Sequence, residues 1–113
     1  MVDIKLYGPI EAETAYRVKA ELESAGGDEI VVRIDSPGGS VFAGFSIWEA
    51  FSAYEGPKRA VIEAAAFSIA GFIATAFDDI EIVPNGYIMI HNPHVVSQGD
   101  ADQLTKDAEL LAK

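Results

Sequence analysis

The segment EIVVRIDSPGGSV, residues 29–41, constrains the fold of this chain more than any other. Its first seven residues (EIVVRID, 29–35) are rich in β-branched side chains, which is typical of a buried strand. The turn Ser36-Pro37-Gly38-Gly39-Ser40 follows directly, because proline and two glycines punctuate the chain there. Residues 41–54 then show the apolar spacing of a helix that packs one face inward. A strand that turns at once into a helix is the first half of a βαβ unit.

The rest of the sequence repeats this alternation. We expect strands at residues 3–10, 58–65, 79–83 and 87–91, and helices at residues 11–25 and 68–77 and from residue 100 onward. The turn Pro84-Asn85-Gly86 joins the last two strands. Strands that alternate with helices predict an α/β fold of repeated βαβ units with a mainly parallel sheet.

Length and composition limit the function classes. With 113 residues the chain is one domain at most, and half of its residues are hydrophobic, as expected for a globular protein. The 18 acidic and 8 basic residues give a net charge of −10, which argues against nucleic acid or an anionic membrane as partner. The absence of cysteine excludes disulfides, thiolate zinc sites and cysteine nucleophiles. The N-terminal MVDIKLYG is no secretion signal, so we expect a cytoplasmic location.

Residues 60–77 are the most apolar part of the chain, and Glu63 is their only charge. Their length would suffice for a membrane span. However, the stretch is rich in alanine rather than leucine, and Glu63 would be costly in lipid. A buried strand that leads into a buried helix accounts for the same residues and leaves Ser68 near the start of that helix.

The position of Ser68 suggests chemistry as well as structure. The first turn of a helix concentrates unpaired N–H groups and the positive end of the helix dipole, which would stabilise an oxyanion formed by attack of Ser68 on a carbonyl. The alternative is that Ser68 only caps the helix. A serine alone does not decide between the two.

The glycine turn and a histidine provide two further signals. Gly38 and Gly39 allow the backbone to approach a ligand and direct N–H groups at it, although an ordinary turn or a phosphate loop would also use them. Neither Walker nor Rossmann spacing follows, so no nucleotide cofactor is expected. His91 ends a predicted strand and is a candidate general base, with His94 as its competitor. No set of ligands around the two histidines suggests a metal.

Three motifs occur in one order: SPGGSVFAG, then AAAFSIAGF, then PNGYIMIHNP. In this combination the chain resembles the Clp protease proteolytic subunit (ClpP-like) family, especially its phage-type head maturation relatives. The resemblance covers the chain from Ile30 onward and implies a ClpP/crotonase-like fold. It also implies a single protease domain over residues 1–113 that lacks its C-terminal part and is cut within the helix after the catalytic histidine.

Carried over to this sequence, the resemblance implies a serine endopeptidase that cleaves extended or unfolded segments of proteins. Ser68 would be the nucleophile and His91 the general base. The backbone N–H groups of Gly39 and Ile69 would form the oxyanion hole, and Gly38 and Gly39 would bind an extended substrate. No cofactor or metal is implied.

The sequence departs from the family pattern at two points. Phe67 stands where the family usually has a small residue, and Ala70 stands where it often has glycine. The family's triad aspartate follows the helix begun at Asp100, and no residue of this chain matches it. Asp100, Asp102 and Asp107 are instead expected to cap that helix or to lie on its solvated face. The activity of the 113-residue chain by itself is therefore left open.

The resemblance also bears on partners. It implies a homo-oligomeric ring that acts on protein or peptide substrates, with an ATP-driven unfoldase as a candidate partner and capsid or scaffold proteins as candidate substrates. A ring subunit or pseudoprotease that binds peptides without cutting them is the alternative. An acyl-CoA enzyme of the related crotonase fold is a third reading, which would need backbone oxyanion donors but no serine nucleophile.

Overall fold

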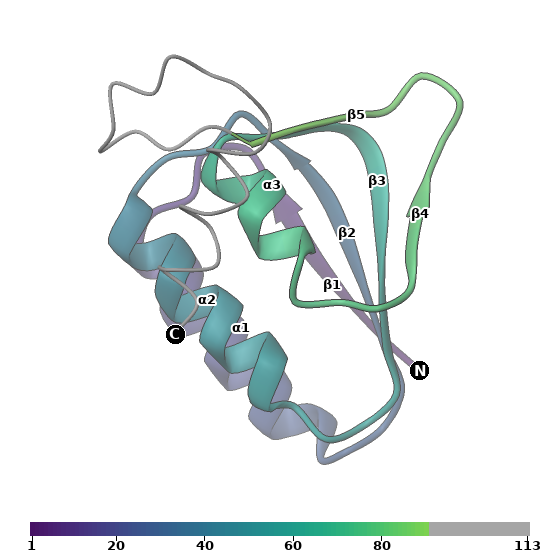
Figure 1. Cartoon of the computed structure of the whole chain (residues 1–113). Coiled ribbons are helices and arrows are strands. Elements are labelled where there is room, and N and C mark those ends of the chain that lie inside the picture. Colours follow the sequence, from purple (N-terminus) through teal and green to yellow (C-terminus); the bar gives the residue numbers. More distant parts are fainter. Residues whose placement is uncertain (91–113) are drawn as a thin grey trace.

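The computed structural model describes residues 1–90, in which parallel strands and helices alternate as predicted (Figure 1). In chain order the elements are β1 (Val2–Tyr7), α1 (Ala12–Ala25), β2 (Ile30–Ser36), α2 (Val41–Ala53), β3 (Lys58–Phe67), α3 (Ile69–Ala74), β4 (Ile80–Ile82) and β5 (Tyr87–Met89). The predicted strand end at His91, and the helix predicted from Asp100, lie outside the described residues.

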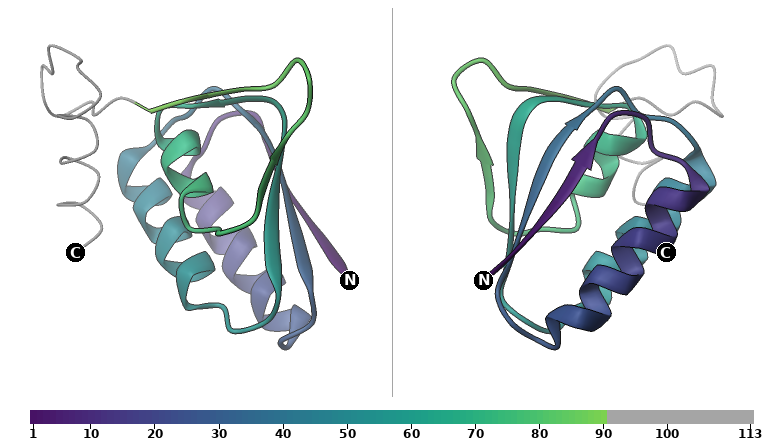
Figure 2. Two further views of the ribbon diagram at one scale, coloured as in Figure 1. Left: turned by 45° about the vertical axis from the view of Figure 1, so that its right-hand side comes forward. Right: turned by 180° about the vertical axis from the view of Figure 1, so that it is seen from behind.

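The strands form one sheet in the order β1-β2-β3-β4, and β5 also pairs with β3. Every pairing is parallel. The helices α1, α2 and α3 cover the same face of the sheet (Figure 2). Right-handed crossovers that advance across a sheet in one direction place their helices on one face in this way. The carboxyl ends of β2 and β3 therefore meet at one edge, where the glycine turn and Ser68 both follow.

The core lies between this face and the helices. Its fully buried side chains come from alternate positions of the strands, such as Ile4 and Leu6 of β1, and from the inner faces of α1 and α2. Aromatic rings fix α3 in place: Phe72 packs against Phe45 and Trp48 of α2, each at 5.6 Å between ring centroids. The short helix after Ser68 is thus held by the core rather than by its own hydrogen bonds.

The strand β3 contains a register shift just before its end. Ile34 of β2 pairs with Ile62, yet Ser36, only two residues later, pairs with Ala66. Two extra residues of β3 are therefore accommodated within the pairing, as in a β-bulge. The side chain of Asp35 accepts a hydrogen bond from the Ala65 N–H at 3.3 Å within this irregular stretch. Beyond this irregularity the end of β3 lies against the glycine turn.

The turn at residues 84–86 does not reverse the chain. The strand β4 pairs with residues 60–62 of β3, and β5 pairs in the same direction with residues 65–67. The two short strands thus continue along one edge of β3, with an excursion between them. Because of this excursion, β4 pairs with β3 before the register shift of β3, and β5 pairs with β3 after it.

Three predicted boundaries are wrong by two or three residues. The strand β1 ends at Tyr7 rather than residue 10, because Gly8 takes a positive φ of 79°. The helix α3 ends at Ala74 rather than Phe77, since the N–H groups of residues 75–77 bond to carbonyls three residues back. The strand β3 reaches Phe67, two residues beyond its predicted end. No helix within residues 1–90 is long and apolar enough to cross a membrane.

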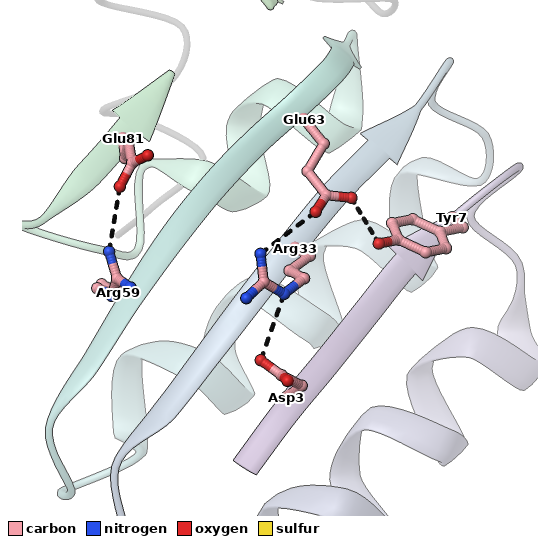
Figure 3. A network of polar contacts seen from close by, with 6 residues as sticks. All are labelled: Asp3, Tyr7, Arg33, Arg59, Glu63 and Glu81. Atoms are coloured by element: carbon pink, nitrogen blue, oxygen red, sulfur yellow. Dashed lines mark hydrogen bonds and ion pairs between the residues drawn. The ribbon is translucent and has the colours of Figure 1, made fainter. Parts of the chain in front are cut away.

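The sheet face away from the helices carries a polar network instead of a second apolar layer (Figure 3). Arg33 lies between Asp3 and Glu63 at 3.3 Å from each, and Tyr7 donates a hydrogen bond to Glu63. Partial burial would by itself lower the pKa of Arg33, but its two carboxylate partners raise it. The hydrogen bond to Glu63, with desolvation and the charge of Glu63, raises the pKa of Tyr7.

The raised pKa of Tyr7 predicts a pH dependence of stability. The folded state holds the phenol proton more tightly than the unfolded chain, so this contribution is complete below the ordinary pKa of about 10 and is lost as pH rises through the folded value. Replacing Tyr7 by phenylalanine should remove it. Urea unfolding between pH 8 and 11 should show the difference in stability between the two proteins shrinking above pH 10; a constant difference would contradict the prediction.

Candidate active site

Ser68 occupies the sharp turn between β3 and α3 and has a strained backbone. Its φ of 58° and ψ of −125° make it the one non-glycine residue with positive φ within residues 1–90. Such a conformation costs about 1–3 kcal/mol and persists only where the surroundings impose it. A serine on a strained turn between a strand and a helix has its hydroxyl presented away from both elements, as in nucleophile elbows.

The side chain of Ser68 is not used as a helix cap. Ser68 is the residue before the first turn of α3, yet its hydroxyl makes no capping hydrogen bond. Its backbone is fixed by other contacts: its N–H donates to the Met89 carbonyl at 2.7 Å, and its carbonyl accepts from the Phe72 N–H at 3.2 Å. The capping interpretation of this serine is therefore not supported, and the hydroxyl is left for other chemistry.

The glycine turn after β2 lies directly against Ser68. Gly38 is buried, with a φ of 106°, and a β-carbon there would lie 3.0 Å from the Ser68 Cβ and 3.6 Å from its Oγ. The same β-carbon would lie 3.0 Å from the carbonyl oxygen of Phe67. Only glycine allows the backbone to come this close at this φ. Two segments 30 residues apart in the sequence thus meet at the serine.

Ile10 holds Gly39 in place through a parallel bridge. The Ile10 N–H donates to the Gly38 carbonyl, and the Ser40 N–H donates to the Ile10 carbonyl, each at 2.8 Å. Successive N–H groups of an extended backbone point to opposite sides. Because the Ser40 N–H faces Ile10, the N–H of Gly39 faces away from it.

Two backbone N–H groups near Ser68 lack an acceptor among residues 1–90. The N–H of Gly39 makes no hydrogen bond to any of these residues. Ile69 is the first residue of α3, so its N–H has no partner within the helix. The close packing of Ile69 on Gly44 of α2, where a β-carbon would lie 2.0 Å from Ile69 Cγ1, fixes this first turn. These are the two N–H groups that the resemblance assigned to an oxyanion hole.

The end of β5 approaches the same place. Met89 pairs with Phe67 at the end of β3, and its carbonyl accepts the Ser68 N–H. Met89 precedes His91 by two residues in the sequence. His91 itself, its competitor His94 and the aspartates of the C-terminal segment lie outside the described residues. Among residues 1–90, the structure brings together Ser68, Gly38 and the turn that contains Gly39.

Sequence reasoning missed Ile10 and Met89, which hold the glycine turn and Ser68 through their backbones. Neither leaves a signal in the sequence, because any residue except proline offers the same N–H and carbonyl groups. It also took Ser36 as part of the turn and gave it no role, although its hydroxyl bonds to Gly38. No group of three potential metal ligands occurs in residues 1–90.

Comparison with known proteins identifies the family of this chain. The family model for Clp protease matches residues 2–113, and the chain belongs to this family. A curated relative from Ligilactobacillus salivarius, named ATP-dependent Clp protease proteolytic subunit, is 33% identical over 87 residues. That match covers 75% of this chain and 44% of the relative, so the chain spans less than half the length of this relative.

A solved structure shows the same fold. A ClpP1 mutant from Listeria monocytogenes superposes with a TM-score of 0.76 at 27% sequence identity. The match covers 97% of this chain and 65% of the solved chain. The predicted ClpP-like α/β fold is therefore confirmed. The family indicated by the three motifs is confirmed as well.

Proposed function

We propose that this protein is a serine endopeptidase that cleaves extended segments of other proteins, with Ser68 as nucleophile and His91 as general base. The observation that carries the proposal is the geometry of Ser68. Its backbone is strained, its hydroxyl is not used as a cap, and the glycine turn lies against its side chain. Strain of this kind gathers at functional sites. Membership of the Clp protease family supports the same assignment.

The proposed chemistry follows the serine protease scheme. The imidazole of His91 removes the Ser68 proton, and the oxygen attacks the peptide carbonyl carbon to form a tetrahedral intermediate. The N–H groups of Gly39 and Ile69 bind the negative oxygen that develops. The C–N bond then breaks, and the amine leaves with the proton from His91. Water, activated by the same imidazole, hydrolyses the acyl-enzyme and restores Ser68.

The substrate is proposed to bind as an added strand beside the Gly38–Gly39 turn. One edge of this turn already pairs with Ile10. The opposite edge presents the N–H of Gly39, which has no acceptor among residues 1–90 and is the kind of group with which an extended peptide forms main-chain hydrogen bonds. An extended backbone fits such an edge whatever its side chains are, so unfolded segments are the expected substrates. Capsid or scaffold proteins are the candidates suggested by the resemblance to phage-type relatives.

We further propose that the protein acts as a subunit of a homo-oligomeric ring in the cytoplasm. The edge formed by β4 and β5 exposes four apolar side chains: Ile82, Tyr87, Ile88 and Met89. Apolar groups gathered on one edge favour contact with further protein. The curated relative is named as ATP-dependent. We propose an ATP-driven unfoldase as the partner that would supply unfolded substrate to the ring.

Covalent labelling of Ser68 tests the catalytic proposal. A fluorophosphonate reacts only with an activated serine, and the product keeps the added mass. We expect the protein at its full natural length to be labelled at Ser68, as located by peptide mass spectrometry, and the Ser68→Ala variant to remain unlabelled. Absence of labelling in a folded wild-type protein would overturn the proposal. Peptide binding without labelling would instead favour a non-catalytic ring subunit.

A further inference from the structure

Ser36 is the one polar residue within residues 1–90 that is completely buried. It is the last residue of β2 and pairs with Ala66 of β3, two residues before Ser68. A buried hydroxyl costs free energy unless it is hydrogen-bonded. An alanine would fill nearly the same space without needing a hydrogen bond. The reason for a hydroxyl at this position must therefore lie in the group to which it bonds.

The partner of Ser36 is the glycine turn itself. The Gly38 N–H donates a hydrogen bond to the Ser36 Oγ at 3.1 Å. Gly38 is buried too, so this N–H has no access to water as a substitute acceptor. The bond therefore fixes the peptide plane that enters Gly38, at the point where the turn contacts Ser68.

The geometry of the turn depends on two anchors. Ile10 holds the Gly38 carbonyl and the Ser40 N–H from one side, and Ser36 holds the Gly38 N–H from within the strand end. The N–H of Gly39 lies between these anchors and is the group assigned above to the oxyanion hole. The Gly39 N–H belongs to the same peptide group as the Gly38 carbonyl. A change in the backbone conformation of Gly38 would therefore turn this N–H away from the reacting carbonyl oxygen.

We infer that Ser36 is a positioning residue, whose hydroxyl holds the Gly38–Gly39 turn so that the Gly39 N–H is aimed at the reacting carbonyl oxygen beside Ser68. This inference rests on the proposed function. The oxyanion exists only in the transition state and intermediate, so a misaimed donor slows the chemical step without weakening ground-state binding. A purely structural serine would instead affect only the amount of folded protein.

The test measures the rate per active site in the Ser36→Ala and Ser36→Cys variants of the protein at its full natural length. Titration with fluorophosphonate gives the concentration of active sites, and the cleavage rate is divided by this concentration to give kcat. The rate constant of labelling is measured from the time course. We expect this constant and kcat to fall about tenfold to a hundredfold in both variants, with KM unchanged. The affinity for a peptide boronate, which mimics the tetrahedral intermediate, should fall by the same factor.

Thr14→Ala is the matched control. The Thr14 hydroxyl also accepts a backbone N–H, from Glu11 at 3.1 Å, but it lies in the first turn of α1 and does not bond to the glycine turn. This variant should lose stability, by about 1 kcal/mol, while its rate per active site stays at the wild-type value.

Two results would overturn the inference. One is a labelling rate per active site in Ser36→Ala that equals wild type, even if the active fraction is lower. The other is an unchanged hydrogen-exchange rate of the Gly38 amide in Ser36→Ala, which would show that the hydroxyl does not hold the turn. If the wild-type protein is not labelled at all, the proposed function itself is wrong. This result is obtained before the variants are compared, so it is distinguished from a failure of the inference about Ser36.

Discussion

Replacing Ser68 by alanine in the full-length protein is expected to lower the rate of cleavage of an unstructured protein by about a million-fold. The change removes the one oxygen that is placed to attack, while the glycine turn and the first turn of α3 stay in place. The residual rate should remain above that in water, because the oxyanion donors still act. Cleavage is followed by gel electrophoresis of an unfolded protein such as reduced casein.

The contact of Gly38 with Ser68 makes the choice of replacement important. Alanine keeps the Ser68 Cβ, which lies against Gly38, and removes only the oxygen. Peptide binding should therefore be retained, and fluorescence anisotropy of a labelled peptide should show this. Cleavage at the wild-type rate in Ser68→Ala, with contaminating proteases excluded, would contradict the role of Ser68.

The strained backbone of Ser68 predicts a difference in stability between two variants that is not expected for a serine that only caps a helix. At a φ of 58°, glycine avoids the steric cost that alanine and serine both bear. We expect Ser68→Gly to be more stable to urea than Ser68→Ala by about 1 kcal/mol, although both are inactive. Equal stabilities, or a more stable alanine variant, would show that the strain is not present in solution.

The second large effect is expected for Gly39→Ala. A β-carbon at this position would lie 2.2 Å from the Ile10 carbonyl oxygen and 2.7 Å from its nitrogen. Both are backbone atoms and cannot rotate away, so the turn must move and the bridge to Ile10 must break. We expect a loss of about 3 kcal/mol in stability and at least about a hundredfold in cleavage rate per folded molecule.

Gly27→Ala separates the two causes of the Gly39 effect. Gly27 has a positive φ of 93°, but a β-carbon there would meet no atom within 4 Å. It therefore carries the backbone cost alone, about 1 kcal/mol or slightly more, and should leave cleavage unchanged. If Gly39→Ala were no worse than Gly27→Ala in either measurement, the tight bridge between Gly39 and Ile10 would be refuted.

Much of the fold could be predicted because its signals are local. The β-branched run before the glycine turn, the apolar periodicity of residues 41–54 and the glycines after α1 each specify an element without reference to distant residues. Boundaries were less accurate where neighbours decide them. The strand β3 extends to Phe67 because β5 pairs with its last residues, and β5 lies 20 residues further along the chain.

The candidate site was predicted from the order of three motifs, and the described residues bring the first two of those motifs, and Met89 of the third, together at Ser68. His91 stays a prediction. The role of Ser36 could not be read from the sequence, because a serine in a Pro-Gly turn is ordinary there. Its significance depends on its complete burial and on the burial of the Gly38 N–H that it accepts.

The sequence by itself determined the alternation of strands and helices and the family, because these depend on side-chain type and spacing, and it supplied Ser68 and His91 as the proposed catalytic pair. Only the tertiary structure decided that Ser68 is strained and uncapped, that Gly38 lies against it, and that Ile10 and Ser36 hold the turn. These features arise where parallel strands end side by side. Backbone groups from segments distant in the sequence meet there, and their hydrogen bonds depend on position rather than on residue type.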